Sequence, residues 1–306
     1  MIYNIRHLTA YSYDRTVASA RLVLRVTPRD EPGQRLANFT LNISPPPLSM
    51  DTERDFYGNT VNVVTIDAEH KELTIEALST VELTHQAALP LEGEPWEDVA
   101  NAALLSRDLT GTAPAHFLFA SPRVQLSPEV ASYARDSFKP GRGILEASRD
   151  MIKRIKDDFD YEPETTDNNT PLTQSFAHRQ GVSQDFAHIM ISGLRGLGLP
   201  AAYVSGYIRT IPPPGEKRLE GADATHAWVA VWCGTSDGWL GFDPTNAIDV
   251  GNDHIALAVG RDYSDVSPVY GVFVGSGGTE LEVEVDVVPV AAPASEARDA
   301  KASSAL

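Results

Sequence analysis

The sequence predicts an α+β protein in which a β-rich first domain precedes a second domain of helices followed by an antiparallel sheet. Apolar and polar residues alternate with period two over roughly the first 85 residues, as they do in half-buried strands. Between residues 127 and 197 apolar residues recur every three to four positions, which is typical of amphipathic helices. Beyond residue 200 the alternation returns, so helices precede strands in the second half.

The first domain is expected to span residues 1–88. The alternation is clearest over residues 39–43 and 73–83, and turn-forming residues such as those at 57–59 separate the runs. Residues 89–126 are irregular and rich in Pro, Ala and small polar residues. We therefore predict that they form a connector with little regular structure.

Four helices are predicted in the second domain, which we place at residues 127–290. Ser127-Pro128 combines an N-cap residue with proline at the first helical position and opens a short helix. A longer helix is predicted over residues 144–159, and a short one over residues 170–181. The fourth covers residues 183–197, where apolar and small residues predominate, so we expect it to be central and buried.

Five strands are predicted after these helices, and all are assigned to the sheet of the second domain. They cover residues 201–210, 227–233, 238–243, 270–274 and 281–288. Residues 291–306 consist of Ala, Ser and charged residues without periodicity, and we predict that this tail is disordered.

The excess of acidic residues argues against nucleic acids and membranes as partners. The chain of 306 residues has 25 Lys and Arg against 42 Asp and Glu, which gives a net charge of −17. An acidic surface repels phosphate backbones and anionic lipid headgroups, so we expect neither a nucleic acid nor a membrane as partner. Residues 1–9 contain no apolar signal segment and no apolar run reaches the length of a membrane span, so we expect a cytoplasmic protein.

The single cysteine, Cys233, excludes an intramolecular disulfide and a zinc site built from cysteines. Because Cys233 lies within an apolar strand, we interpret it as a small buried hydrophobe. Asp253-His254 has the composition of a metal-ligand pair, but no second histidine or carboxylate cluster has ligand spacing. We therefore expect no metal and no cofactor.

Three residues are placed where their side chains suit nucleophilic catalysis. Ser183 opens the central helix, whose unpaired N–H groups and dipole favour an anion. His226 starts one predicted strand and Asp243 ends the next, so a hairpin sets the carboxylate beside the imidazole. Each residue alone has an ordinary explanation: an N-cap for Ser183, a structural histidine for His226 and a turn for Asp243. The combination of the three is what indicates a catalytic site.

Several neighbouring residues are weaker candidates. Asp185 and His188 point away from Ser183 around the helix, so we expect them to support the helix through hydrogen bonds. Candidate residues of a substrate cleft are Gln184, Asp223 and Trp228, although a tryptophan in a sheet is also well explained as core.

Segments 181–188, 221–228 and 241–246 resemble the three sequence blocks of the transglutaminase-like superfamily. The chain is most similar to bacterial members that carry a β-rich region before the core, with supporting motifs at residues 56–59 and 260–263. The resemblance covers nearly the whole chain except the tail. It implies a papain-like core, with helices packed on an antiparallel sheet and a triad of Cys, His and Asp.

On this resemblance His226 is the general base and Asp243 is the acid that orients it, but Ser183 stands where the family has its nucleophilic cysteine. A thiol at a helix N-terminus beside an imidazole ionises near neutral pH, whereas a hydroxyl does not. We therefore expect the Ser183 form to be inactive. Three explanations stay open: a substitution introduced into a thiol enzyme, a natural pseudoenzyme, and a working serine variant.

With cysteine at position 183, the resemblance implies acyl transfer at peptide or carboxamide bonds through a thioester. Hydrolysis, as in a protease or amidase, is favoured over transglutamination because water is always present. The alternative is a pseudoenzyme that binds extended peptides without turnover. In either case we expect a peptide or protein as partner, and the oligomeric state stays open.

Overall fold

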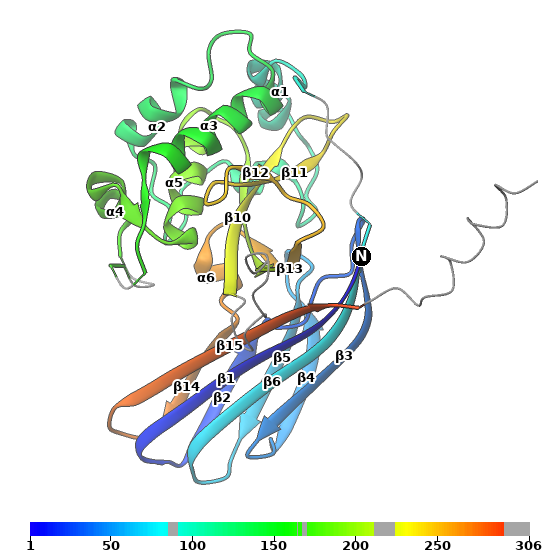
Figure 1. The fold of residues 1–306 in the computed structure, drawn as a ribbon, viewed down its shortest axis with the longest axis vertical. Helices are drawn as coiled ribbons and strands as arrows, with labels where there is room; N and C mark the ends of the chain where they lie inside the picture. Colours follow the sequence, from blue (N-terminus) through cyan, green and yellow to red (C-terminus); the bar gives the residue numbers. More distant parts are fainter. Residues whose placement is uncertain (85–90, 164, 167–169, 211–223, 291–306) are drawn as a thin grey trace, which may run out of the picture.

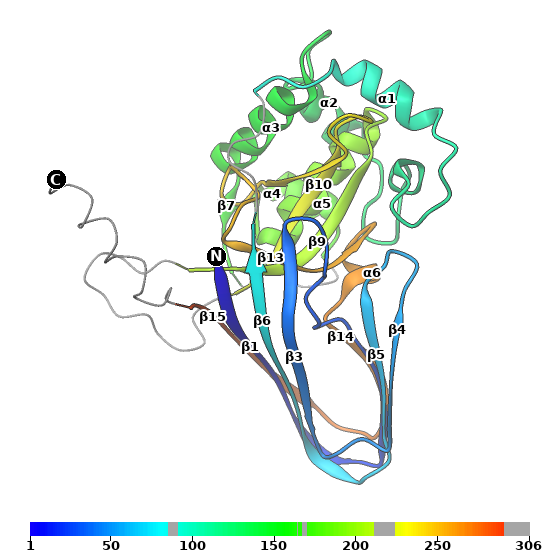
Figure 2. The ribbon, with the colours of Figure 1, turned by 90° about the vertical axis from the view of Figure 1, so that its right-hand side faces the viewer.

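The computed structural model describes residues 1–84, 91–163, 165–166, 170–210 and 224–290. A β-sandwich forms one part of the molecule, and a unit of helices around a second sheet forms the other (Figure 1). The two sheets of the sandwich are seen as separate layers in Figure 2, with the helical unit at one end of them. No helix in these residues is long and apolar enough to cross a membrane.

The sandwich consists of two four-stranded antiparallel sheets, with the strand orders β15-β1-β6-β3 and β14-β2-β5-β4. The period-two alternation of the first domain turns every second side chain inward, as predicted, so that residues such as Leu24, Ile66 and Ile75 are buried between the layers. The strands are β1 (Ile2–Val17), β2 (Ser19–Leu24), β3 (Gln34–Ser44), β4 (Ser49–Arg54), β5 (Thr60–Ile66), β6 (His70–Leu83), β14 (Val269–Val274) and β15 (Thr279–Pro289).

From their position in the chain we expected the last two strands to continue the sheet of the second domain. This prediction is wrong. Instead β14 pairs with β2, and β15 pairs with β1 along its whole length. The physical reason is that each strand has apolar residues to bury on this side: Val269 of β14 packs against the core of the sandwich, and Val285 and Val287 of β15 are buried in a cluster that β1 and β6 share with the second sheet. The sandwich is therefore built from both ends of the chain.

The helical unit surrounds a five-stranded sheet of order β12-β11-β10-β9-β13. Strand β13 was not apparent from the alternation because its residues are buried on both faces. The strands are β9 (Ala201–Ile208), β10 (Ala224–Trp232), β11 (Trp239–Asp243), β12 (Ile248–Asp249) and β13 (His254–Gly260), and the short strands β7 (Asp160–Tyr161) and β8 (Gln180–Gly181) form a separate pair.

The four helices predicted for the second domain are confirmed. Ser127 is the N-cap of its helix, and its hydroxyl accepts a hydrogen bond from the Val130 N–H at 3.4 Å. The expectation that residues 89–126 have little regular structure is wrong, because α1 and a short 3-10 helix lie there, and α1 contacts α3. The helices are α1 (Trp96–Leu104), η1 (Pro114–Phe117), α2 (Pro128–Arg135), α3 (Ile144–Asp158), α4 (Leu172–His178), α5 (Ser183–Gly196) and α6 (Tyr263–Val266).

Two side-chain amides join the sandwich to β13, the edge strand of the second sheet. The Gln34 amide donates to the Ala256 carbonyl and accepts from the Ala256 N–H, both at 2.8 Å. The Asn59 amide makes the same pair of bonds with Val259, also at 2.8 Å. Each amide thus takes the place of a neighbouring strand, which satisfies backbone groups that an edge leaves unpaired. These contacts fix the sandwich against the sheet that carries His226.

Candidate active site

Ser183 is the first residue of α5, and its side chain is 8 % exposed. Val182 occupies the N-cap position, and its N–H donates to the carboxylate of Asp185 at 2.9 Å. The interpretation of Ser183 as an N-cap is therefore wrong. Its hydroxyl makes no hydrogen bond with any residue that the structure describes. The group lies at the positive end of the helix dipole, where a negative charge is stabilised.

The carboxylate of Asp185 fixes the start of α5. Besides the Val182 N–H, it accepts hydrogen bonds from the hydroxyls of Thr166 at 2.7 Å and Ser175 at 3.1 Å. A Cβ atom at Gly181 would come within 2.7 Å of this carboxylate, so the close approach requires glycine. Asp185 therefore supports the helix, as predicted, and holds the backbone of residue 183 in place.

His188 is likewise a support of the helix rather than a partner of Ser183. Its Nε2 accepts a hydrogen bond from the Tyr263 N–H at 3.2 Å, and its ring lies 5.0 Å from the ring of Tyr203. Burial lowers the pKa of His188 to about 4, so the imidazole is neutral near neutral pH.

His226 and Asp243 meet as the hairpin argument predicts. They lie on the paired strands β10 and β11, and Nε2 of His226 is 2.8 Å from Oδ2 of Asp243. Both Thr245 and Asn246 donate their backbone N–H to Oδ1 of the same carboxylate, at 2.9 and 3.2 Å. Burial alone raises the pKa of Asp243, but the hydrogen bonds from the surrounding donors outweigh it and hold that pKa well below its usual range. The buried carboxylate is therefore ionised.

A second histidine, His254, also contacts this carboxylate. Its Nε2 is 3.1 Å from Oδ2 of Asp243, and its Nδ1 accepts a hydrogen bond from the Gly251 N–H at 3.4 Å. Because Nδ1 accepts, the ring proton is on Nε2 and is donated to Asp243. His254 lies at the first position of β13 and is packed edge-on against the ring of Trp228.

A pocket of about 440 Å³ contains both Ser183 and His226. Part of its wall comes from the helical unit, and part comes from strands β1 and β15 of the sandwich. Its described lining contains no Asp, Glu, Lys or Arg, and several tyrosines contribute to it. The residues are His7, Thr9, Tyr11, Tyr161, Val182, Ser183, Gln184, Tyr203, Ser205, Thr225, His226, Ala227, Tyr263, Pro268, Val269, Leu281 and Val283.

Comparison with known sequences identifies the family. Residues 3–82 match the bacterial transglutaminase-like N-terminal region, and residues 131–244 match the transglutaminase-like superfamily. An uncharacterized protein of Mycobacterium tuberculosis is 38% identical over 94% of this chain and 92% of its own. The chain belongs to the transglutaminase-like superfamily.

Two further relatives of this transglutaminase-like protein bear on its fold. An uncharacterized protein of Mycobacterium leprae is 30% identical over 93% of this chain and 98% of its own. The crystal structure of a putative cysteine protease from Cytophaga hutchinsonii matches with a TM-score of 0.73 at 19% identity, over 96% of this chain and 92% of that one. The shared architecture therefore includes the sandwich as well as the papain-like core.

In this transglutaminase-like chain the nitrogens of His226 and His254 and an oxygen of Asp243 lie within 4.8 Å of one another. That spacing would suit a metal ion, and no sequence pattern predicts this grouping. However, both imidazoles donate protons to the carboxylate in their observed positions, so a metal ion would have to displace these hydrogen bonds. The network is fully explained as a hydrogen-bonded cluster.

The other residues singled out from the sequence are the cleft candidates Gln184, Trp228 and Asp223, and the single cysteine. Gln184 lines the pocket of the transglutaminase-like core, whereas Trp228 is buried beside Gly206 and does not line it. Asp223 lies outside the described residues. Cys233 is completely buried, and burial raises the pKa of its thiol well above the ordinary value, so it behaves as the buried hydrophobe that we expected.

The groups that reach the pocket from elsewhere in the chain could not be predicted from sequence patterns. His7 and Thr9 of β1 lie in its wall, where His7 is hydrogen-bonded to the hydroxyls of Tyr207 at 2.7 Å and Thr9 at 3.1 Å. Alternation placed both in a strand, but nothing in their spacing linked them to His226. His254 carried a weak signal as the second residue of Asp253-His254, without any pattern that joined it to Asp243.

Proposed function

We propose that this pocket is built for thiol-type acyl transfer at peptide or carboxamide bonds, with residue 183 as nucleophile, His226 as base and Asp243 as its orienting acid. In this proposal hydrolysis is favoured over transfer to an amine, and the Ser183 form is inactive. The observation that carries the proposal is the 2.8 Å contact between Nε2 of His226 and Oδ2 of Asp243, beside a helix start that displays residue 183 in the same pocket.

The contact defines the useful tautomer of His226. An ionised carboxylate only accepts hydrogen bonds, so Nε2 carries the proton and Nδ1 of the neutral ring has a free lone pair. Nδ1 makes no hydrogen bond with the described residues. It is therefore available to take a proton from a nucleophile, as a base in a triad must.

With a thiol at position 183, the balanced reaction has two halves. The thiol gives its proton to His226, the thiolate sulfur bonds to the substrate carbonyl carbon, and the C–N bond breaks as the imidazolium returns the proton to the leaving amine or ammonia. Water then attacks the thioester while His226 takes one of its protons. Breakage of the C–S bond releases the carboxylic acid and restores the thiol.

A hydroxyl at position 183 does not ionise near neutral pH, as a thiol there would. The helix start and the imidazole lower a thiol pKa into the range of neutral pH, so a thiolate forms before the substrate binds. A serine hydroxyl stays protonated under the same influence and must lose its proton during the attack. This difference is the basis for expecting inactivity in the Ser183 form.

The charge of the lining supports hydrolysis over amine transfer. An amine acceptor is cationic at neutral pH, and a carboxylate in the pocket would attract it. The described lining contains none. Water needs no such group.

The proposal is tested by the Ser183→Cys variant. Its new thiol should react with iodoacetamide at mildly acidic pH at least about tenfold faster than free cysteine, because a lowered pKa leaves more of it ionised. Turnover of peptide amides should appear with it. The Ser205→Cys variant is the matched control, because Ser205 lines the same pocket from β9 without a helix start. Equal labelling of the two variants, with no turnover, would overturn the proposal.

A second candidate function is peptide binding without catalysis, and the hydroxyl of Ser183 is the observation that favours it. In that case the unaltered protein binds a peptide amide in the pocket, and Ser183→Cys gains neither fast labelling nor turnover. Binding measured alongside both assays separates this function from the enzyme.

A further inference from the structure

Strand β15 forms an open edge beside the pocket. It is the outermost strand of its sheet, and in the described part of the chain no strand pairs with its second side. Figure 1 shows β15 crossing the molecule directly below the end of β10, the strand that carries His226. The side chains of Leu281 and Val283 line the pocket, yet they are 58% and 45% exposed.

The hydrogen bonds at the two ends of the β1–β15 pair show which backbone groups face this edge. Asp14 N–H donates to the Gly278 carbonyl at 3.2 Å, and Val290 N–H donates to the Ile2 carbonyl at 2.8 Å. In an antiparallel pair, the backbone N–H and C=O groups of successive residues point to opposite sides of the strand. The even-numbered residues of β15 therefore form the backbone hydrogen bonds with β1. The N–H and C=O groups of Leu281 and Val283 consequently point to the open edge.

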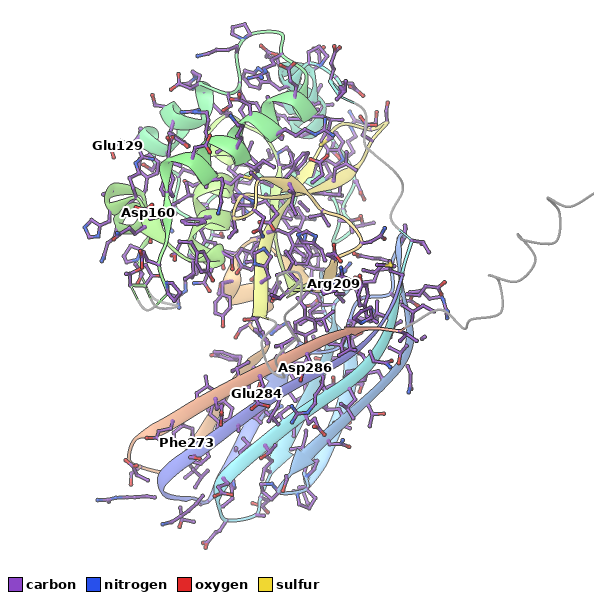
Figure 3. All side chains as sticks on the ribbon, viewed as in Figure 1. Glu129, Asp160, Arg209, Phe273, Glu284 and Asp286 are labelled. Atoms are coloured by element: carbon purple, nitrogen blue, oxygen red, sulfur yellow. The ribbon has the colours of Figure 1, made fainter. Side chains whose placement is uncertain are left out.

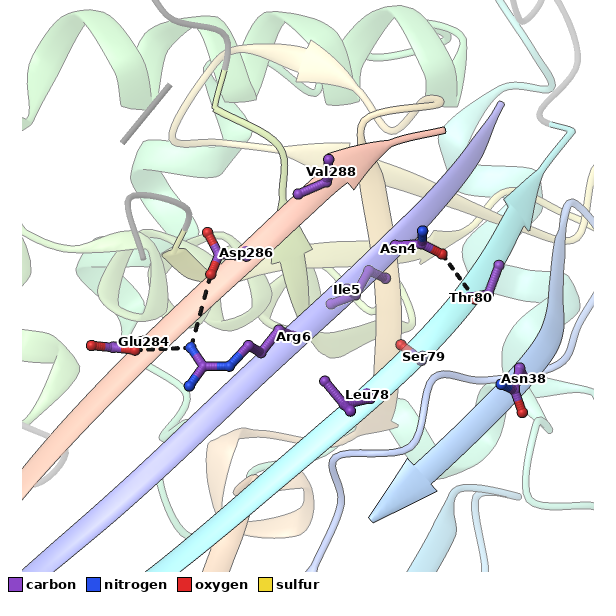
Figure 4. Close-up of a pocket in the computed structure, with 10 residues that line it drawn as sticks. All are labelled: Asn4, Ile5, Arg6, Asn38, Leu78, Ser79, Thr80, Glu284, Asp286 and Val288. Atoms are coloured by element: carbon purple, nitrogen blue, oxygen red, sulfur yellow. Dashed lines mark hydrogen bonds and ion pairs between the residues drawn. The ribbon is translucent and has the colours of Figure 1, made fainter. Parts of the chain in front are cut away.

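Side chains of β15 alternate between two environments. The odd-numbered residues from Leu281 to Val287 face the pocket and the cluster shared with the second sheet, whereas the even-numbered residues from Glu280 to Asp286 are acidic and face outward. Glu284 and Asp286 share Arg6, with contacts of 2.9 and 4.0 Å, on a hollow of about 670 Å³ that has no residue in common with the Ser183 pocket (Figures 3 and 4). The outward row is Glu280, Glu282, Glu284 and Asp286.

Glu282 is the acidic residue between Leu281 and Val283. Neither Glu280 nor Glu282 has an ion-pair partner among the described residues. No ion pair with a described residue therefore neutralises the negative charge beside the pocket. A strand added to this edge would place its own outward side chains next to these glutamates.

The acidic row also argues against a second copy of the chain as occupant. Two copies of β15 paired antiparallel around a two-fold axis would bring their outward faces to the same side. Glutamates would then lie across from glutamates, which is destabilising. A strand with basic residues at alternate positions has no such penalty.

We propose that an extended peptide adds to the open edge of β15, with basic side chains beside Glu280 and Glu282 and uncharged side chains directed into the pocket. Backbone hydrogen bonds to Leu281 and Val283 would hold it, as in other cases of strand addition. The peptide is thereby delivered to residue 183. Delivery of the peptide to residue 183 for reaction rests on the proposed function, whereas binding of the peptide to β15 does not.

The test uses the unaltered Ser183 protein, so that binding is measured without turnover. The probe is a capped, fluorescent peptide of alternating lysine and glutamine, followed by anisotropy. Methylation of one backbone nitrogen at a time should weaken binding by about 3- to 10-fold at every second position and leave the positions between unchanged. A peptide of alternating glutamate and glutamine should not bind.

Two protein measurements complete the test. Hydrogen exchange at the Leu281 and Val283 amides should slow when the lysine peptide binds. Glu282→Lys should weaken binding by about fivefold, whereas Glu72→Lys, the same change at an exposed residue of β6, should have little effect.

Some outcomes overturn the inference without touching the proposed function. One is peptide binding that is indifferent to the methylation pattern and leaves the β15 amides unprotected. Another is a concentration-dependent dimer that protects the same amides and excludes the peptide, which would assign the edge to a second copy. Strand addition with no activation of the thiol in Ser183→Cys would leave the inference standing and the proposed chemistry refuted.

Discussion

His254 donates a hydrogen bond from Nε2 to Oδ2 of Asp243 at 3.1 Å, and this oxygen also accepts one from His226 at 2.8 Å. The amide of Asn246 is a third donor to the same oxygen, at 2.8 Å. Three donors on one carboxylate oxygen fix its orientation and stabilise its charge in a buried setting. His254 therefore acts on His226 only through Asp243, as a positioning residue.

Replacing His254 should slow the chemistry without removing it. In the Ser183→Cys background, His254→Phe takes away one donor, so Asp243 holds His226 less firmly, and we expect labelling at mildly acidic pH to fall by about 3- to 10-fold. His254→Gln keeps an N–H donor and should recover part of the loss. If both variants lose folding stability but label at the parental rate, His254 has only a structural role.

Acidification should destabilise the protein well before its carboxylates are protonated. Burial lowers the pKa of His7 and of His188 to about 4, below the ordinary value of 6.5. Between pH 6.5 and 4 the unfolded chain binds protons that the folded protein does not, so the free energy of unfolding falls as the pH falls. The loss amounts to roughly 3 kcal/mol per histidine.

The lowered pKa of Asp243 acts in the opposite sense and in a different range. Its contribution is present above the ordinary carboxyl pKa of 3.8 and is lost only below it. Urea unfolding at several pH values between 4 and 7 isolates the histidines. His7→Gln should make the pH dependence shallower, and an unchanged slope would contradict the assignment to His7.

The parts of the fold that sequence predicts well are those with local causes. Helix periodicity located α3, and the Ser127-Pro128 cap located the start of α2. The partner of a strand is a non-local property, since alternation gives the faces of β15 but not whether it pairs with β1 or with the second sheet. That is why the last two strands were assigned to the wrong sheet.

The site likewise contains residues that local sequence patterns predict and residues that they do not. Ser183 begins α5, Asp243 ends β11 and His226 lies near the start of β10, positions where sequence patterns carry information. His7 reaches the pocket from β1, at the other end of the chain, and His254 reaches the carboxylate from β13, which does not pair with β11. Their signals were a histidine within an alternating run and a histidine after an aspartate, neither of which specifies a neighbour.

Removal of the Gln34 amide should weaken the junction between sandwich and core. Gln34→Ala leaves the Ala256 N–H without a partner in a buried edge, whereas the Ala256 carbonyl keeps the Arg29 N–H at 3.0 Å, and we expect a loss of about 1 to 3 kcal/mol in the free energy of unfolding. Gln34→Glu keeps an acceptor for the Ala256 N–H but sets a carboxylate oxygen against the carbonyls of Arg29 and Ala256. Urea unfolding should therefore place both variants below the parent, and parental stability in either would show that the paired bonds contribute little.

Substitution of Asp243 by asparagine should slow turnover severely, although the two side chains have nearly the same shape. Oδ1 accepts two backbone N–H groups and Oδ2 accepts three side-chain donors, so an amide NH₂ in either orientation faces donors instead of acceptors. In the Ser183→Cys background, we expect Asp243→Asn to slow turnover at least about a hundredfold.

A matched control separates this effect from the general cost of losing a carboxylate. Asp249 lies on β12, next to β11, and forms a partly exposed ion pair with Arg149 at 2.8 Å. Asp249→Asn removes the same charge close by without altering the donors around His226, so turnover should stay near the parental rate. Equal losses in the two variants would show that charge near the sheet, rather than the hydrogen bond to His226, supports the reaction.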